Sequence, residues 1–533
     1  MKLYDTYFDK YMNLYPSLND ELRIPKYKRL QVHYENNISD LFINKLKKMN
    51  IKYLDLLNKK EKLNIYDQCL KYSLQQSLEG LKYDLHLMPI NQITNQIANY
   101  IQLLNGTGYF IFESIQDYKD FMLKNKEFLI WCNQLITNLQ LGINKKLVLP
   151  KIITKKIIYG LEKIITNKNY INVNVPKSLQ KEWTQNVNEF VLEPIKNVLD
   201  FLINTYLPEC RSTLGYSSLP NGKNIYKYIV KTNITKTMSI KKIHTLGIKE
   251  INRIYTEMEK VTTTLKYKKG VKQLMNYLIT TPINKYKDKK EVFENYENIK
   301  NYLWKDIIPD YFNITIKNPY EIKPVPEELE KSSPGAYYIP GDLIGSRNGV
   351  FYLNTRDIKN MLKLDCLALS KHEGIPGHHL HITYMNENKK IPLFIKSSIY
   401  NAFIEGWALY AENIGYDKKY DISYFGKLNS EMLRAIRLVV DTGIHYYNWN
   451  YNKCYKLFKR YTTFSDSEID AEIYRYVGLP GQALSYKIGE LTILKLRKKY
   501  MKKYCDIKKF HKLILENGQL PLDILIDKFK NIM

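Results

Sequence analysis

The segment 371–381 reads Lys371-His372-Glu373-Gly374-Ile375-Pro376-Gly377-His378-His379-Leu380-His381 and holds four of the nine histidines of this 533-residue chain. Histidines beside a glutamate are typical of zinc hydrolases, in which imidazoles bind the metal and the carboxylate deprotonates the metal-bound water. The common pattern places the second histidine one helical turn after the first, a position that Pro376 occupies here. The helix that carries His372 is therefore expected to be distorted.

An apolar run over 361–369 predicts a buried helix that leads to these histidines. Because the proline cannot donate a hydrogen bond to the carbonyl of His372, and a glycine follows it, we expect a bulge or kink in this helix. A bulge that absorbs two residues would place His378 where the second ligand normally lies. The sequence leaves both His378 and His379 open as the second ligand, and we favour His378.

A third protein ligand is expected from the following helix, 403–412, which carries two glutamates among apolar residues. Glu405 and Glu412 are seven residues apart and so share one helical face. A buried carboxylate is costly unless it is paired or binds a metal. We predict that Glu405 is the third ligand and that Glu412 and His379 support the ligands from behind. The alternative is that both glutamates point to solvent.

The helix predicted over 431–447 carries a polar stripe of Arg437, Asp441 and His445 on an otherwise apolar sequence. Such a stripe lines a cleft or forms a buried network. We predict that Asp441 is a supporting residue that orients His445, whose free nitrogen donates to the oxyanion of the reaction. A structural histidine with an aspartate partner in the core is the alternative.

Near the C-terminus, the segment 474–487 contains a Pro-Gly turn that leads into a long helix. We predict that the Tyr476 hydroxyl is a second oxyanion donor. Arg475 and Gln482 are predicted to contact the substrate.

Residues 306–355 differ from the rest of the chain because they are rich in Pro, Tyr and Gly. Short β-prone runs within 334–340 and 349–355 predict two strands of a small sheet. Metallopeptidases commonly hold an extended substrate along an edge strand beside the metal, so Tyr337 and Tyr338 are predicted substrate contacts. A β-ribbon that merely covers the helical core is the alternative.

Composition limits the class of protein. Hydrophobic residues make up 44% of the chain, enough for a large core, and no apolar run is long enough to predict a transmembrane helix. The first residues lack the apolar stretch of a signal peptide, so we expect a soluble, cytoplasmic protein. The six cysteines lie far apart without a Cys-x-x-Cys pair, which indicates free thiols in a reducing compartment.

The formal net charge of +27 could indicate a nucleic-acid partner. However, the lysines are spread along the chain between acidic residues, and Lys, Asn, Ile and Tyr are abundant together, as a coding bias toward A and T would produce. We attribute the charge to this bias and to a solvated surface. Neither nucleic acid nor a membrane is expected as a partner.

Amphipathic helices are predicted over 38–135, 175–206 and 239–280, because apolar residues recur there every three or four positions. We divide the chain into an N-terminal helical half, 1–235, and a catalytic half that carries the metal site, 236–533, which together form one integrated unit. The predicted fold class is mainly α, with a small β-sheet beside the histidines.

These motifs resemble those of the domain-of-unknown-function family 885, whose members look like zinc-dependent peptidases of the gluzincin kind. The matching segments are 87–92, 219–223, 336–338, 372–380, 405–412, 437–445, 475–476 and 480–487. The resemblance implies a large helical fold similar to the angiotensin-converting-enzyme and oligopeptidase group, with a deep cleft between two halves and the small sheet near the active site. His381 departs from the pattern, because the family usually has Gln there.

The sequence thus predicts a zinc metallopeptidase with one Zn²⁺ per chain, held by His372, His378 and Glu405. Glu373 acts as general base on the metal-bound water, which attacks a peptide carbonyl, and then passes its proton to the leaving amine. The closed cleft of the fold analogy favours short peptides as substrates. Two alternatives stay open: a zinc hydrolase of a non-peptide amide or ester, and a non-catalytic basic binding or structural protein that retains the fold.

Overall fold

The computed structural model describes residues 2–167, 174–327, 330, 334–343, 345, 347–416 and 422–533. The chain divides into two compact units. Unit 1 comprises residues 1–228 and 477–479, and unit 2 comprises residues 229–476 and 480–533. The change from the first unit to the second after Tyr228 lies seven residues before the predicted boundary at 235.

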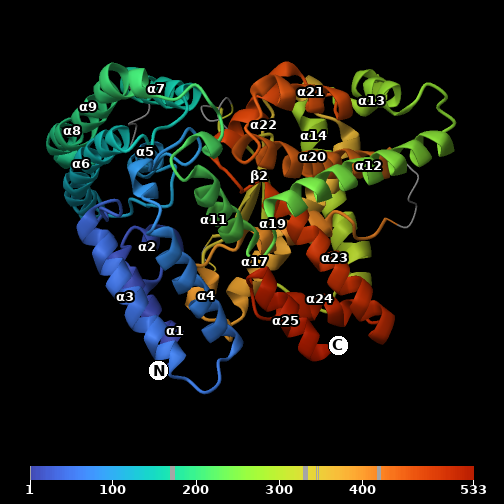
Figure 1. Cartoon of the computed structure of the whole chain (residues 1–533), viewed down its shortest axis with the longest axis horizontal. Helices are drawn as coiled ribbons and strands as arrows, with labels where there is room; N and C mark the ends of the chain where they lie inside the picture. Colours follow the sequence, from blue (N-terminus) through green and yellow to red (C-terminus); the bar gives the residue numbers. More distant parts are fainter. Residues whose placement is uncertain are drawn as a thin grey trace. The chain divides into compact units, whose positions relative to one another are not determined.

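Unit 1 is helical and is coloured from blue to green in Figure 1. Its helices are α1 (Leu3–Leu14), α2 (Leu18–Leu22), α3 (Asp40–Asn58), α4 (Ile65–Gly80), α5 (Gln96–Leu104), α6 (Ile115–Asn144), α7 (Lys151–Thr166), α8 (Gln180–Val187), α9 (Glu193–Phe201) and α10 (Leu207–Glu209), and α11 (Gly222–Ile234) crosses into unit 2. Two of them begin with capping boxes, in which side chains and backbone N–H groups exchange hydrogen bonds across the first turn. Asn64 and Asp67 start α4 in this way, and Ser114 and Asp117 start α6.

Unit 2 is also mainly helical and contains the segments that carry the predicted site (Figure 1). Its helices are α12 (Ile240–Thr264), α13 (Val271–Thr280), α14 (Lys289–Tyr302), α15 (Ile308–Tyr311), α16 (Cys366–Glu373), α17 (His378–Glu387), α18 (Leu393–Lys396), α19 (Asn401–Ala411), α20 (Ile422–His445), α21 (Tyr451–Tyr461), α22 (Asp466–Gly478, with its last two residues in unit 1), α23 (Leu484–Tyr504), α24 (Ile507–Leu515) and α25 (Leu522–Ile532). No helix in the described part of the chain is long and apolar enough to cross a membrane.

These helices confirm the mainly α fold class and the helical pattern predicted over 38–135, 175–206 and 239–280. Two boundaries differ from the predicted ones. The helix expected from residue 361 begins at Cys366, after two short 3₁₀ turns, and the helix expected from about residue 431 already begins at Ile422.

A three-stranded sheet lies in unit 2 and consists of β1 (Tyr320–Pro324), β2 (Ala336–Ile339) and β3 (Gly349–Leu353) in the order β1-β3-β2. Strand β3 pairs parallel with β1 and antiparallel with β2. The two predicted strands correspond to β2 and β3. Strand β1 is not evident from the sequence, because Tyr-Glu-Ile-Lys-Pro is short, charged and ends in proline.

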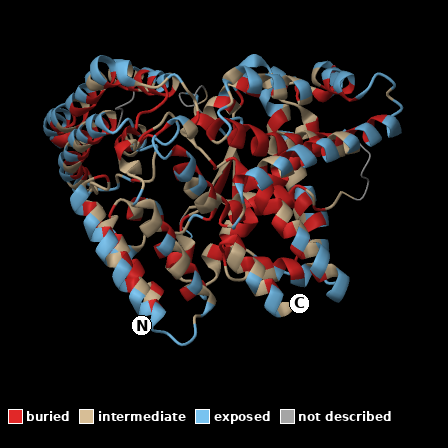
Figure 2. Ribbon diagram, viewed as in Figure 1, coloured by how far each residue is buried: buried red, intermediate tan, exposed pale blue. Residues whose placement is uncertain are grey.

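The core of unit 2 centres on α19 and α20, whose residues are mostly buried (Figure 2). Helix α19 packs along α23, and α12 packs along α20. The first pair approaches closely at two glycines, where a Cβ on Gly489 would lie 2.0 Å from the carbonyl oxygen of Ala402 and 2.5 Å from the Cα of Gly406. Only glycine fits there, so this contact fixes the position of α19, which carries Glu405 and is directly followed by Glu412.

Charged side chains form a cluster between α12, α20 and α23, with Lys487 fully buried at its centre. The members are Glu250, Arg253, Lys427, Glu431, Lys487 and Glu490. The Lys487 Nζ lies 2.5 Å from Glu431 and 2.6 Å from Glu490. Because each buried charge has an opposite charge within bonding distance, the cost of desolvation is largely offset.

Replacing Gly489 with alanine is expected to destabilise unit 2, because the new methyl group overlaps backbone atoms of α19 rather than a side chain that could move. Overpacking of this kind costs about 1–3 kcal/mol. The matched control is Gly160→Ala in α7, where a Cβ meets no atom within 4 Å and alanine favours a helix by about 1 kcal/mol. Thermal unfolding measures both changes, and an undiminished Tm for Gly489→Ala would contradict the close approach.

His511 of α24 is buried as a neutral side chain. Its Nδ1 lies 2.8 Å from the carbonyl oxygen of Tyr311, and its Nε2 lies 2.7 Å from the Tyr410 hydroxyl. A carbonyl oxygen only accepts, so Nδ1 donates to it and Nε2 accepts from the hydroxyl. Burial lowers the pKa of His511 to about 3.

This neutral histidine makes stability depend on pH. The unfolded side chain titrates at about pH 6.5, so below that pH the unfolded state binds more protons, and stability falls toward pH 3 by up to about 1.4 kcal/mol per pH unit. In His511→Gln this contribution is absent, and its free energy of unfolding is expected to decrease less than that of the wild type between pH 7 and pH 5. Urea unfolding at both values measures the two decreases, and equal decreases would show that His511 is not held neutral.

Candidate metal centre

The histidine segment forms two separate helices, α16 and α17, joined by the turn 374–377. The expected distortion at Pro376 is confirmed, but it is a break between two helices rather than a bulge or kink within one continuous helix. Helix α16 ends because Pro376 has no N–H for the carbonyl of His372. A Cβ on Gly377 would lie 2.0 Å from that carbonyl oxygen, so glycine is required for the turn to pass so close to the end of α16.

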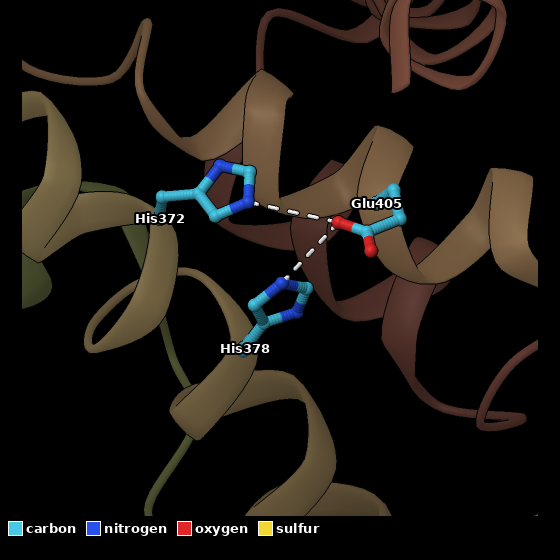
Figure 3. Close-up of side chains that lie close together, drawn as sticks. All are labelled: His372, His378 and Glu405. Carbon is cyan, nitrogen blue, oxygen red and sulfur yellow. Dashed lines mark ion pairs between the residues drawn. The ribbon is translucent and has the colours of Figure 1, made fainter. Parts of the chain in front are cut away.

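This turn and helix α19 bring three side chains together (Figure 3). His372 from the end of α16, His378 from the start of α17 and Glu405 from α19 point toward one another. The Glu405 Oε2 lies 3.6 Å from His372 Nε2 and 3.5 Å from His378 Nε2. Trp407 holds the turn against α19, because its indole Nε1 donates to the carbonyl of Pro376 at 2.9 Å.

The distances from Glu405 Oε2 to the two histidine nitrogens suit metal ligands better than hydrogen-bonded groups, and the three ligand atoms all lie within 4.8 Å of one another. Glu405 Oε2 is buried and has no hydrogen-bond partner among the described residues. Four-coordinate zinc with bonds of about 2.0–2.2 Å holds neighbouring ligand atoms about 3.4 Å apart, close to the observed 3.5 and 3.6 Å. Within the ranges that the structure describes, this is the one group of His, Cys, Asp and Glu side chains that converges in this way.

Glu412 supports His372 from the opposite side of the ring. His372 Nδ1 lies 2.8 Å from Glu412 Oε1, which also lies 3.7 Å from a nitrogen of Arg434. The other oxygen, Oε2, accepts from Ser430 Oγ at 2.8 Å. Because a carboxylate only accepts, Nδ1 donates and Nε2 is left to bind a metal. Burial disfavours the charged ring, but Glu405 and Glu412 raise the pKa of His372 to about 9, so the pocket favours a positive charge.

Glu373, the predicted general base, is the last residue of α16 and directly follows His372. Its side chain is half-buried, and no described residue forms a hydrogen bond or ion pair with its carboxylate. A general base must be free to accept a proton. The Glu373 carboxylate is therefore not engaged by another described side chain.

His379 contacts the β-sheet and not the three converging side chains. Its Nδ1 lies 2.8 Å from the Tyr338 hydroxyl, and its ring packs on Tyr320 with centroids 4.6 Å apart. Burial lowers the pKa of His379 to about 3, so the ring is neutral. The other predicted substrate contact on β2, Tyr337, stacks on Tyr352 of β3 with centroids 5.2 Å apart. His379 thus links the histidine segment to β2.

The two predicted oxyanion donors are held by other partners. His445 Nε2 lies 2.9 Å from the carbonyl oxygen of Tyr476 and so donates to it. The Tyr476 hydroxyl donates to Glu472, and the Asp441 carboxylate accepts from the backbone N–H of Gly481 at 3.0 Å. His445 and Tyr476 are fully buried, and each forms a hydrogen bond within the protein. Their contact with an oxyanion stays a prediction.

Tyr486 of α23 is a residue of the site that the sequence analysis does not single out. Its ring lies nearly parallel to that of His372, at 15° and with centroids 6.3 Å apart. Its hydroxyl lies 3.4 Å from an Arg475 nitrogen, which also donates to the Gln482 side chain at 3.0 Å. The predicted substrate contacts Arg475 and Gln482 therefore meet beside Tyr486. Its place in the segment 474–487 is the only sequence signal for it.

The fold and the site define a class: a mainly helical protein with a buried His-His-Glu cluster whose geometry fits a divalent metal. The chain belongs to the family described as "Bacterial protein of unknown function (DUF885)", whose model matches residues 25–528. No curated protein matches the chain significantly.

Two solved structures are similar to the chain over its whole length. One is described as "the putative lipoprotein from Colwellia psychrerythraea"; it is 23% identical, with a TM-score of 0.87 over 99% of this chain and 98% of that one. The other is described as "a putative lipoprotein of unknown function from Shewanella oneidensis"; it is 16% identical, with a TM-score of 0.78 over 100% of this chain and 99% of that one. These likenesses show that the three proteins share a fold.

Replacing Glu412 with glutamine is expected to lower the affinity for zinc about 10–100-fold. The amide keeps the shape of the side chain but loses the negative charge that orients His372 and increases its basicity. Glu294→Gln in α14 is the matched control, because Glu294 is exposed on the surface. This variant should bind zinc like the wild type. Competition with a chromogenic chelator measures both affinities, and an unchanged affinity in Glu412→Gln would argue against the supporting role.

Proposed function

We propose that the protein is a zinc metallopeptidase that cleaves short peptides. The observation that carries the proposal is the convergence of His372, His378 and Glu405. Glu373 directly follows His372, and its carboxylate has no hydrogen-bond or ion-pair partner among the described residues. Two imidazoles and one carboxylate are a ligand set of catalytic zinc sites, which keep a fourth position for water. A bound zinc would supply a Lewis acid that acidifies this water and polarises the substrate carbonyl.

The chain's own groups account for the proton transfers that hydrolysis requires. Glu373 accepts a proton from the water and passes it to the leaving nitrogen, as an unpaired carboxylate can. Glu412 holds His372 in the tautomer whose Nε2 faces Glu405. The resemblance of the motifs to gluzincin-like peptidases agrees with this division of roles.

An edge strand beside the histidine segment favours peptides over other amides and esters. Strand β2 lies at one edge of the sheet, and its Tyr338 bonds to His379, the neighbour of His378 in the chain. An extended peptide can add to such an edge through main-chain hydrogen bonds. A small non-peptide amide or ester, the alternative substrate, would make no use of β2.

A non-catalytic binding protein is a second candidate, because the net charge of +27 would suit an acidic partner. The unpaired Glu373 argues against it, since a binding protein has no use for a base beside a metal ligand. Affinity for nucleic acid that falls steeply with salt would favour this candidate.

The first test is the zinc content of the purified protein by elemental mass spectrometry. Wild type is expected to hold about one zinc per chain, and Glu405→Ala far less, because it retains only two of the three protein ligands. Glu294→Gln is the control and should retain the wild-type content. A folded wild type that takes up no metal when zinc is supplied would sink the proposal.

The second test separates catalysis from metal binding. Glu373→Gln is expected to keep its zinc but to hydrolyse a peptide pool about 10²–10⁴-fold more slowly, because the amide cannot accept the proton of the water. Liquid chromatography with mass spectrometry measures the loss of substrate. Wild-type rates in a zinc-loaded Glu373→Gln protein would exclude Glu373 as the general base.

A further inference from the structure

Three arginines lie around Tyr486, and two of them are paired with carboxylates. The Arg437 guanidinium lies 4.7 Å from the centroid of the Tyr486 ring and bonds to Glu472 through two nitrogens, at 3.1 and 3.2 Å. The Arg434 guanidinium lies 5.9 Å from the same centroid, and one of its nitrogens is 3.7 Å from Glu412. The charges of these two arginines are therefore balanced within the protein.

The third arginine, Arg475, forms hydrogen bonds only with neutral groups in the described part of the chain, although the nearby Glu472 carboxylate attracts it electrostatically. One nitrogen donates to the amide oxygen of Gln482 at 3.0 Å and lies 3.4 Å from the Tyr486 hydroxyl. Its Nε is buried and has no acceptor among the described residues. The carboxylate of Glu472 is already engaged by Arg437. A partly buried guanidinium without a carboxylate is costly, and a bound anion would complete its coordination.

Arg475 lies within reach of the candidate metal centre. Tyr486 connects them, because its ring is parallel to that of His372 and its hydroxyl contacts Arg475. These contacts keep the guanidinium within about 13 Å of the His372 ring, a distance that about four residues of extended chain span at about 3.3–3.6 Å each. A carboxylate bound by Arg475 would thus belong to the same short peptide whose amide lies at the metal.

We propose that Arg475, with Gln482 and the Tyr486 hydroxyl beside it, binds the terminal carboxylate of the substrate, so that the enzyme removes short segments from the C-terminal ends of peptides. This inference rests on the proposed hydrolase function. A planar guanidinium donates two parallel hydrogen bonds to one carboxylate, which makes arginine suited to the task. An acidic side chain of the substrate is the other source of the same chemistry, and the test distinguishes the two.

The test uses three pools of hexapeptides with free amino termini and random uncharged residues. The first pool ends in a carboxylate, the second ends in a carboxamide, and the third ends in a carboxamide but contains one internal glutamate. Zinc-loaded wild type is expected to hydrolyse the acid pool with a kcat/KM about 100-fold higher than either amide pool, the scale of a desolvated charge pair.

Variants of Arg475 show whether this preference depends on the guanidinium. Arg475→Gln is expected to lower kcat/KM for the acid pool about 100-fold, so that the preference for this pool over the amide pools is lost. Arg475→Lys keeps the charge without the planar fork and should show an intermediate preference. Arg460→Gln, an exposed arginine of α21, is the matched control and should keep the full preference. Each variant should keep the zinc content and the Tm of the wild type, and measuring both excludes a loss of folding as the cause of a lower rate.

The possible results separate this inference from the proposed function. Equal hydrolysis of the acid and amide pools by wild type would overturn the inference and leave the hydrolase intact. A preference for the pool with internal glutamate, lost in Arg475→Gln, would overturn the terminal carboxylate as the ligand. If wild type hydrolyses no pool, the proposed function fails. Equilibrium dialysis of the same pools then tests whether Arg475 binds the terminal carboxylate. Selective retention of the acid pool by wild type but not by Arg475→Gln would uphold the binding role of Arg475. Equal retention of the acid pool by both proteins would overturn this role.

Discussion

The turn between α16 and α17 is the constraint on which the candidate centre depends. In a continuous helix, side chains six residues apart point in different directions, so His372 and His378 could not converge. Because the first helix ends and a second begins, both imidazoles reach Glu405, at 3.6 and 3.5 Å. The turn is bonded to Trp407 on the helix that carries Glu405. The turn therefore fixes the positions of α16, α17 and α19, which supply the three side chains, relative to one another.

The charged side chains of the site fall into two groups. Some have charges that are compensated by neighbouring side chains and so stabilise the site, and others are available to bind a ligand. Glu412, at the end of α19, bonds to His372 of α16 and to Ser430 of α20. Burial alone would raise the pKa of Glu412, but Arg434 and His372 hold it below its ordinary value. This carboxylate is satisfied on several sides and joins three helices. Arg475, by contrast, has no carboxylate of its own among the described residues.

Much of the fold could be predicted from the sequence, because apolar periodicity and turn residues are local properties. A proline within the expected helix led to the preference for His378, which the structure places beside Glu405. Strand β1 escaped detection because its parallel pairing with β3 is a tertiary property of a short polar run. A polar stripe on an apolar helix indicates that its polar side chains are buried, but it does not show which groups they bond to. The hydrogen bond from His445 to the carbonyl of Tyr476 could therefore not be predicted. The same holds for Tyr486, whose neighbours come from other helices.

The charge cluster centred on Lys487 limits how the sequence can change. Lys487 is fully buried against Glu431 and Glu490. Removing one member leaves the remaining charges of the cluster unbalanced in a low dielectric, which is costly, whereas exchanging a whole buried set for apolar residues of similar volume is often neutral. Single substitutions at these positions are therefore expected to be destabilising. In homologous sequences the cluster should covary, with its members charged together or apolar together.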